Sequence, residues 1–445
     1  MNGYQMSKSK KLKLFSCIAL LVGAMFGSAI FSLSGLTIFE AGPSALLSWI
    51  IAAPIMLIYG LLMAELASFY PKSGGVYVFP ARAIKGKKGE FWGWISCWGY
   101  ILGNFAAVAF SAIFVGVYLS LFIPGTESLQ VPIAIASMIL VLILNVIKIK
   151  DVGFINNMLV AALLVIMILF VVIAITNQSF QIENLHNFFS QGRSGNFACI
   201  SMVPICLVAY GAIVAVAFMA NDVENPNKTI PKASIIAICI TAAIYVLILF
   251  ATLGVVTSQY LEANPDVLMA PIFAACANLV NAKWLMSLVS IASVIALVTT
   301  MNVLVSVNAR AIQAAAEDKI LPKAFAASNK NNQPIVAVIV TVVICSVISC
   351  FPIYVNEIVN LGVLFNVLTI FITVIALVVA RKNSKFPKGG FKLKGGNFLA
   401  YVFLLILLIC NIFNVITSDL LMVCIYTVVL LAIGIIIFLI AKSRS

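Results

Sequence analysis

Charged residues are scarce in this chain. Only 9% of its 445 residues are Asp, Glu, Lys or Arg, whereas 63% are hydrophobic, and the mean hydropathy is +1.16. A soluble domain of this size carries far more charge on its surface. The composition therefore excludes a soluble globular protein and indicates a chain that lies in a lipid bilayer.

The side chains that usually perform catalysis or bind metals are also nearly missing. The sequence has one histidine, His186, and none of its ten cysteines forms a CxxC pair. The motifs GxSxG, HExxH and GxxxxGK[ST] do not occur. We therefore predict no catalytic residue, no metal site, no cofactor and no ATP-driven step in this chain. The cysteines, most of which lie in apolar stretches, are interpreted as buried and inert.

Long apolar runs recur from one end of the chain to the other. Each is long enough to cross about 30 Å of hydrocarbon as a helix. The first run is too long for a removable signal peptide and lacks its cleavage site. We expect an all-α protein that forms one integral membrane domain over residues 1–445. Its 12 transmembrane helices are predicted near residues 14–38, 44–66, 91–123, 131–147, 153–176, 197–220, 233–257, 283–308, 334–352, 358–380, 397–417 and 420–440.

The basic residues are unevenly placed between these runs. With 12 spans both termini lie on one side, and all but Arg193 and Lys283 of the 27 Lys and Arg residues fall on that side. Basic residues concentrate in cytoplasmic loops of membrane proteins. The net charge of +13 is therefore a topology signal, and we expect both termini in the cytoplasm and no binding to nucleic acid.

Small residues interrupt the first apolar run. Residues 23–31 read GAMFGSAIF, where a simple membrane span carries Leu and Val. An unpaired backbone group in lipid is so costly that a helix breaks at that depth only where the break lines a cavity. The free N–H groups and the positive dipole end at such a break suit a small carboxylate. The alternative is that these small residues allow close helix packing.

A second break is predicted in the sixth run, where residues 208–212 read VAYGA. If the first five spans and the next five form two halves, the discontinuous helices 1 and 6 occupy corresponding positions. Because five is odd, the two halves have opposite orientations in the membrane. We expect inverted repeats at about 14–176 and 197–380, followed by extra helices at about 397–440.

Acidic residues are almost absent from the apolar runs. Only Glu65 lies within one, near its cytoplasmic end, where we interpret it as a gating or helix-end charge paired with a Lys or Arg. A multiply charged substrate needs a buried countercharge, whereas a zwitterion does not. Its carboxylate suits N–H groups around Ser28 and Ala29, and its ammonium suits carbonyl groups of residues 25–26 and 209–210.

Three amides in the apolar runs are further candidates. An amide in a membrane span either lines a pathway or forms a hydrogen bond with a neighbouring helix, and the sequence leaves both open. We expect Asn104 to contact the substrate, and Asn157 and Asn302 to take part in gating or coupling.

Four segments of the chain follow a known pattern. Residues 27–31, GSAIF, are similar to GSGIF, and residues 64–77, AELASFYPKSGGVY, to AELxxxxPxxGGxY. Residues 224–231, ENPNKTIP, are similar to NPxRxIP, and residues 308–322, NARAIQAAAEDKILP, to NxRxxxAxAxDGxLP. With these motifs in order, the chain resembles the amino acid–polyamine–organocation (APC) superfamily, which includes bacterial basic amino acid and polyamine antiporters.

The resemblance implies an inverted five-plus-five fold with two extra helices that works by alternating access. It also implies a position for the substrate site. The implied site residues are Met25, Gly27, Ser28, Ala29, Asn104, Ala209, Tyr210 and Gly211.

Two departures from the family pattern bear on substrate and coupling. Basic amino acid and polyamine exchangers use a glutamate in the sixth span, where this chain reads YGAIV at 210–214. Some proton-coupled relatives carry a lysine in the fifth span, where Asn156 and Asn157 stand. We therefore predict a plasma-membrane secondary transporter of neutral or diverse amino acids, monomeric or homodimeric. A basic amino acid/polyamine antiporter and, in another class, a channel remain alternatives.

Overall fold

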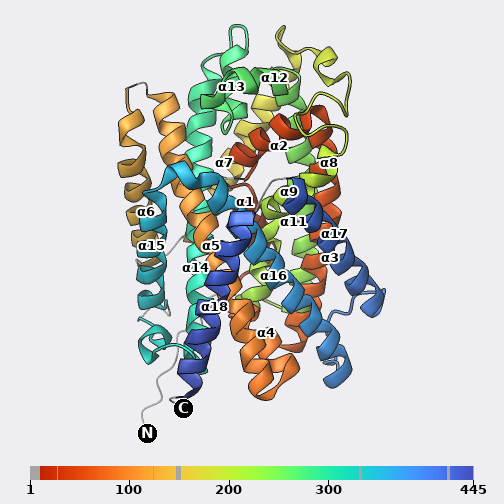
Figure 1. Ribbon diagram of the computed structural model, residues 1–445, viewed down its shortest axis with the longest axis vertical. Coiled ribbons are helices and arrows are strands. Elements are labelled where there is room, and N and C mark those ends of the chain that lie inside the picture. The colour runs from red at the N-terminus through yellow and green to blue at the C-terminus, as the bar shows by residue number, and fades with distance from the viewer. Residues whose placement is uncertain are drawn as a thin grey trace.

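The molecule is built from helices. The computed structural model describes residues 11–27, 29–123, 125–146, 152–329, 333–417 and 421–443, and within these ranges it contains helices, two isolated bridges and no β-strand. Most long helices run roughly along the long axis of the molecule (Figure 1). This form is expected, because a backbone in lipid must pair its own N–H and C=O groups.

Helices occupy all twelve predicted apolar runs. They are α1 (Leu14–Met25), α2 (Ser34–Ala41), α3 (Ala45–Phe69), α5 (Gly86–Phe122), α6 (Gln130–Val146), α7 (Val152–Thr176), α8 (Ala198–Ser201), α9 (Val203–Ala209), α10 (Ala215–Phe218), α11 (Pro226–Leu253), α14 (Leu285–Glu317), α15 (Ile335–Ser349), α16 (Val355–Asn383), α17 (Gly396–Thr417) and α18 (Leu421–Ser443). Three shorter helices lie between the runs, namely α4 (Gly75–Ile84), α12 (Ser258–Ala263) and α13 (Pro271–Asn278).

Fewer helices than predicted are long and apolar enough to cross a membrane on their own. Eight in the described ranges qualify, or nine when the bent pair Ala198–Ala209 and Gly211–Phe218 counts as one span. The first two predicted spans lie in one apolar stretch, Leu14–Phe69, and the apolar helices α6 and α15 have only 17 and 15 residues. The helices are those of a multi-pass membrane protein, and the count of 12 stays a prediction.

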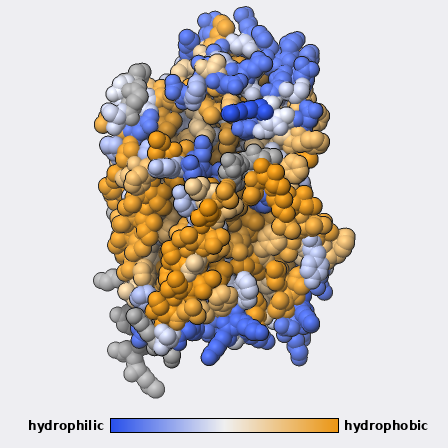
Figure 2. Space-filling view, in the orientation of Figure 1, coloured by the Kyte–Doolittle hydropathy of each residue, from blue (hydrophilic) through white to orange (hydrophobic). Residues whose placement is uncertain are grey.

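A hydrophobic belt crosses the middle of the face shown in Figure 2. Figure 2 shows apolar residues across the central part of this face, with hydrophilic residues gathered at both ends. The belt includes large exposed side chains of the outer helices, such as Phe398 and Leu405 on α17 and Val428 on α18. The long helix α5, in contrast, is mostly buried and packs against α4, α14 and α16. It is therefore a central element, whereas α18 lies at the lipid-facing periphery.

Several helices extend past the ends that hydropathy predicts. Helix α5 begins at Gly86 rather than 91, α11 begins at Pro226 rather than 233, and α14 continues to Glu317 rather than ending near 308. The last turns of α14 are rich in alanine, the strongest helix former, so the helix continues after the apolar run has ended. Pro226 suits the first position of α11, where no intrahelical N–H bond is needed.

Polar contacts join distant segments at one end of the bundle, which we call the α4 end (Figure 1). The N–H of Leu12 donates to the carbonyl oxygen of Asp222 at 2.8 Å, and the N–H of Glu224 donates to the carbonyl of Leu12 at 2.9 Å. The Asp222 carboxylate in turn lies 3.7 Å from the Arg310 guanidinium. The start of the chain, the segment after α10 and helix α14 are thus held together at this end.

Candidate functional site

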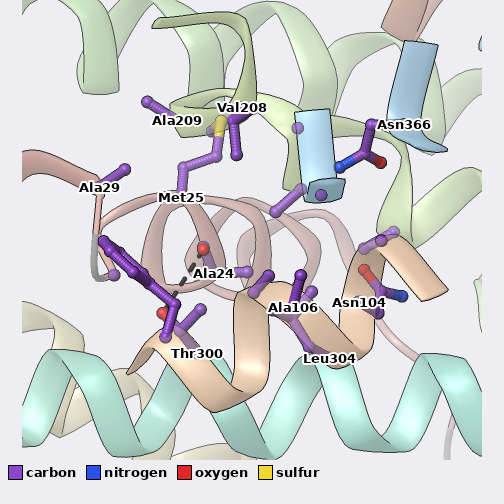
Figure 3. Close-up of a pocket in the computed structure, with 18 of the residues that line it drawn as sticks. Ala24, Met25, Ala29, Asn104, Ala106, Val208, Ala209, Thr300, Leu304 and Asn366 are labelled. Carbon is purple, nitrogen blue, oxygen red and sulfur yellow. Dashed lines mark hydrogen bonds between the residues drawn. The ribbon is translucent and has the colours of Figure 1, made fainter. Parts of the chain in front are cut away.

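A cavity lies inside the bundle, between the two interrupted helices (Figure 3). Its volume is about 80 Å³, several times the roughly 10–15 Å³ that one water molecule needs on the same measure, so it admits a small organic molecule. Its walls come from α1, the π-helix Ala29–Leu33, α5, α9, the 3-10 turn Gly211–Val214, α14 and α16. Six predicted site residues line it: Met25, Gly27, Ala29, Asn104, Ala209 and Gly211.

The first helix is interrupted at the cavity. Helix α1 ends at Met25, the N–H of Gly27 turns back to the Met25 carbonyl at 2.7 Å, and a π-helix begins at Ala29. Ser28, predicted as a site residue, lies outside the described residues. The first N–H groups of a helix have no partner within it. The π-helix therefore presents N–H groups where the sequence predicts a carboxylate.

Gly27 makes the close approach of α1 to α14 possible. A Cβ atom on Gly27 would stand 2.0 Å from the Oγ1 atom of Thr300, a distance at which no two such atoms can coexist. The Thr300 hydroxyl also donates a long hydrogen bond, 3.5 Å, to the Ala24 carbonyl (Figure 3). Here the glycine is required by packing, and that packing forms one wall of the cavity.

The second interruption follows α9. This helix ends at Ala209, a 3-10 turn follows over Gly211–Val214, and the axis bends by 43° between the two halves. A Cβ atom on Gly211 would meet no other atom within 4 Å. Gly211 therefore faces open space. The carbonyl groups at the end of α9 carry the negative end of its dipole toward the break.

Buried aromatic side chains connect the two interruptions. The Tyr245 hydroxyl on α11 donates to the Met25 carbonyl, and the Tyr210 hydroxyl donates to the Trp49 carbonyl at 3.2 Å. The Tyr210 and Tyr245 rings lie 5.3 Å apart between centroids. Tyr210 was predicted to contact the substrate, but its side chain is absent from the cavity lining and packs behind the break. It supports the wall through its backbone.

Two amides face the cavity from α5 and α16. The Nδ2 atom of Asn104 is buried and has no hydrogen-bond partner among the described residues, so it is a donor available to a bound molecule. Asn366 lines the same cavity and lies near Asn104 in Figure 3. The sequence reasoning missed Asn366 and Thr300. The signal for Asn366 was an amide inside the apolar run 358–380, which is the same signal that marked Asn104.

The cavity has no charged wall. Among the described residues that line it, none is Asp, Glu, Lys, Arg or His. Burying an unpaired charge is far more costly than burying a neutral group. Main-chain dipoles, the amides of Asn104 and Asn366 and the hydroxyl groups of Tyr100 and Thr300 remain to bind polar atoms, so the site suits the two ends of a zwitterion better than a charged side chain.

Aromatic rings separate the cavity from the α4 end. Tyr100, which lines the cavity, packs edge-on against Phe218, with 5.5 Å between ring centroids. Phe218 in turn packs edge-on against Phe79 of α4, at 5.9 Å. All three side chains are buried. Passage toward the α4 end therefore requires these rings to move.

Glu65 and Asn302, two of the predicted gating or coupling residues, lie outside the cavity. The Glu65 carboxylate pairs with the Arg381 guanidinium at the α3–α16 contact. The Asn302 amide oxygen accepts from Asn145 Nδ2 of α6 at 2.8 Å, and the Ser306 hydroxyl donates to Asn145 Oδ1 at 2.6 Å. The side chain of Asn157 lies outside the described residues. The structure thus brings six of the eight predicted substrate-site residues to one cavity and leaves Glu65 and Asn302 apart from it.

Comparison with known proteins gives matches over most of the chain. Residues 12–439 match the sequence model of a family described as amino acid permease. A branched-chain amino acid permease of Bacillus subtilis is 24% identical, over 74% of this chain and 72% of the relative. From the same organism, an aspartate–proton symporter is 26% identical over 72% of this chain and 63% of the relative, and a serine/threonine exchanger is 26% identical over 56% of each chain. These proteins are similar in sequence, and their names state different substrates.

Proposed function

The chain belongs to the amino acid permease family, and we propose that it moves a neutral amino acid, or several, across the membrane by alternating access. The observation that carries the proposal is a cavity enclosed by two helix interruptions and lined by no charged side chain. The family consists of transporters rather than enzymes. The named relatives include neutral and acidic substrates, so the choice of a neutral substrate rests on the cavity and not on the relatives.

The proposed binding mode uses the main chain for the two charged groups of the substrate. The carboxylate accepts hydrogen bonds from N–H groups at the start of the π-helix near Ala29. It also accepts hydrogen bonds from the side-chain amide of Asn104, whose Nδ2 atom has no partner among the described residues. The ammonium donates to carbonyl groups at the end of α9. Helix-end contacts are worth only about 0.3–2 kcal/mol each, so several together give the moderate affinity that release requires.

We also propose the finer architecture on which alternating access depends. It comprises 12 transmembrane helices, with inverted repeats at about 14–176 and 197–380, extra helices at about 397–440, and both termini in the cytoplasm. The supporting observation is that the interruptions after α1 and α9 line one cavity. The aromatic rings between Tyr100 and Phe79 form the inner gate, while Glu65, Asn157 and Asn302 are candidates for gating or coupling. A monomer or a homodimer is compatible with this arrangement.

Counterflow in proteoliposomes tests the proposal. Vesicles containing the purified protein are loaded in turn with each amino acid and with agmatine and cadaverine, and uptake of the same radiolabelled compound is measured. We expect saturable, trans-stimulated uptake of neutral amino acids, with protein-free vesicles as the control. A channel gives flux without trans-stimulation. An exchanger of basic amino acids or polyamines gives trans-stimulated uptake only for those compounds. If no amino acid stimulates uptake of its own label, the proposal is wrong.

Substitution of Asn302 tests whether this residue takes part in coupling transport to a gradient or only packs α14 against α6. Asn302→Ala removes one hydrogen bond between α6 and α14, and such bonds contribute about 0.6 kcal/mol on average in membrane proteins. We expect a small loss of stability in thermal unfolding and uptake within about twofold of the wild type. Thr299→Ala, which removes a bond only within α14, is the matched control. Loss of gradient-driven uptake with normal stability and normal exchange would instead indicate a coupling role.

A further inference from the structure

A smaller chamber of about 30 Å³ adjoins the main cavity behind the second helix interruption. We call it the second chamber. We infer that it receives the side chain of the transported amino acid and that it selects neutral substrates with short or branched aliphatic side chains. This inference rests on the proposed function and adds the chemical class of the substrate to it.

The two spaces adjoin at Gly211. Four residues line both of them: Tyr100, Val208, Gly211 and Asn366. The space next to the Gly211 Cα atom is open, since a Cβ built there meets nothing within 4 Å. We infer that a substrate whose charged groups lie at the ends of the interrupted helices places its side chain past Gly211, where this open space lies.

Most of the wall of the second chamber is aliphatic. It comes from α3, α9, the 3-10 turn, α16 and α17, with side chains such as Met56, Leu207, Val214, Val363, Val367 and Leu407. Within the part of the chain that the structure describes, no Asp, Glu, Lys, Arg or His lines it. An aliphatic side chain is stabilised there by leaving water, whereas a charged side chain would lose its hydration without gaining a partner.

The polar groups at the far side of the second chamber are already hydrogen-bonded within the protein. The Tyr59 hydroxyl shares a hydrogen bond of 3.2 Å with the Thr373 hydroxyl. The Thr369 hydroxyl donates to the Phe365 carbonyl at 3.0 Å. Neither group needs a bond from the substrate, so a methyl group placed beside them leaves no polar atom unsatisfied.

The size of the second chamber limits the side chain. A volume of about 30 Å³ is two to three times the roughly 10–15 Å³ that one water molecule needs on the same measure. Two or three methyl-sized groups fit, which is enough for the branched end of a valine, leucine or isoleucine side chain. The ring systems of phenylalanine and tryptophan do not fit unless the walls move.

Val367 allows the inference to be tested in both directions, because it lines the second chamber and not the main cavity. Val367→Phe fills the chamber. We expect counterflow of leucine, isoleucine and valine to fall at least about tenfold, while that of glycine and alanine stays within about twofold. Val367→Ala enlarges the chamber, and we expect phenylalanine and methionine to compete at least about fivefold better. Ile375→Phe, which adds the same ring to an exposed position of α16, is the matched control.

The outcomes distinguish this inference from the proposed function. Equal loss of glycine and leucine transport in Val367→Phe, together with an unchanged substrate profile in Val367→Ala, overturns the assignment of the second chamber. Unchanged transport of every substrate in both variants overturns it as well. If the wild-type protein transports only charged amino acids, this inference is wrong, but the protein is still an amino acid transporter. If the wild type transports no amino acid, the proposed function itself fails.

Discussion

Gly27→Ala is expected to lower amino acid uptake by at least about fivefold. The added Cβ would lie 2.0 Å from Thr300 Oγ1 and 2.7 Å from the Cβ and Cγ2 atoms of Thr300. Thr300 is β-branched and stiff, so its side chain cannot simply turn away. Helix α1 must therefore move away from α14 at the point where both line the cavity. Overpacking of this kind costs about 1–3 kcal/mol, which lowers the population of the competent arrangement by about fivefold to 150-fold.

Two variants serve as controls for Gly27→Ala. Gly211→Ala adds the same methyl group to the other glycine of the site, where no described protein atom lies within 4 Å, and it should leave the thermal stability of the protein nearly unchanged. Adding Thr300→Gly to Gly27→Ala removes all three clashing atoms and should recover part of the uptake. The recovery is incomplete, since a glycine inside a helix costs roughly 1 kcal/mol. Wild-type uptake by Gly27→Ala, or no recovery in the double variant, would contradict the packing argument.

These two glycines show what the sequence could predict about the site. Small residues marked both interruptions, but the sequence left close packing and a binding site as alternatives. The structure shows that Gly27 is packed against Thr300, whereas Gly211 faces open space. Thr300 is 273 residues away from Gly27 in the sequence. Nothing in the local pattern at either position indicates that the two meet, so this distinction needed the fold.

The fold was predictable where hydrophobicity alone decides it. Each apolar run is helical because lipid permits little else, and this held for all twelve runs in the described residues. Helix ends were less predictable, as the extension of α14 to Glu317 shows, because alanine-rich sequence continues a helix outside the hydrocarbon. The sequence was equally unable to predict which two charged residues form an ion pair. A basic partner for Glu65 was expected, but the sequence offers many cations near the cytoplasmic ends, and only the packing of α3 on α16 selects Arg381.

The second large effect, a loss of stability, is expected when the ion pair between Glu65 and Arg381 is broken. The Nε and Nη2 atoms of Arg381 donate to the two Glu65 oxygens at 2.8 and 2.7 Å. Glu65 is completely buried, and its Oε2 atom also accepts the N–H of Leu393 at 2.9 Å. Arg381 Nη1 further donates to Asn397 at 3.1 Å, so the pair joins α3, α16 and the segment before α17.

Arg381→Met is expected to destabilise the protein by about 3–5 kcal/mol, because it leaves the Glu65 carboxylate buried without its countercharge. The measurement is thermal unfolding of the detergent-solubilised protein, followed by its intrinsic fluorescence. Glu90→Gln is the control, since it breaks the partly exposed pair with Lys442, and such pairs contribute only about 0–1 kcal/mol. If Arg381→Met is no less stable than Glu90→Gln, the buried pair does not hold these helices together.

A double variant separates the stabilising role of the pair from a role in gating. Glu65→Leu combined with Arg381→Met replaces both charges by apolar side chains, and such replacements are often neutral or stabilising. We expect the double variant to recover most of the stability lost in Arg381→Met. Uptake that returns with stability would assign the pair to packing alone. Uptake that stays low in a stable double variant would mean that transport requires the pair itself to form and break between α3 and α16, which also wall the second chamber.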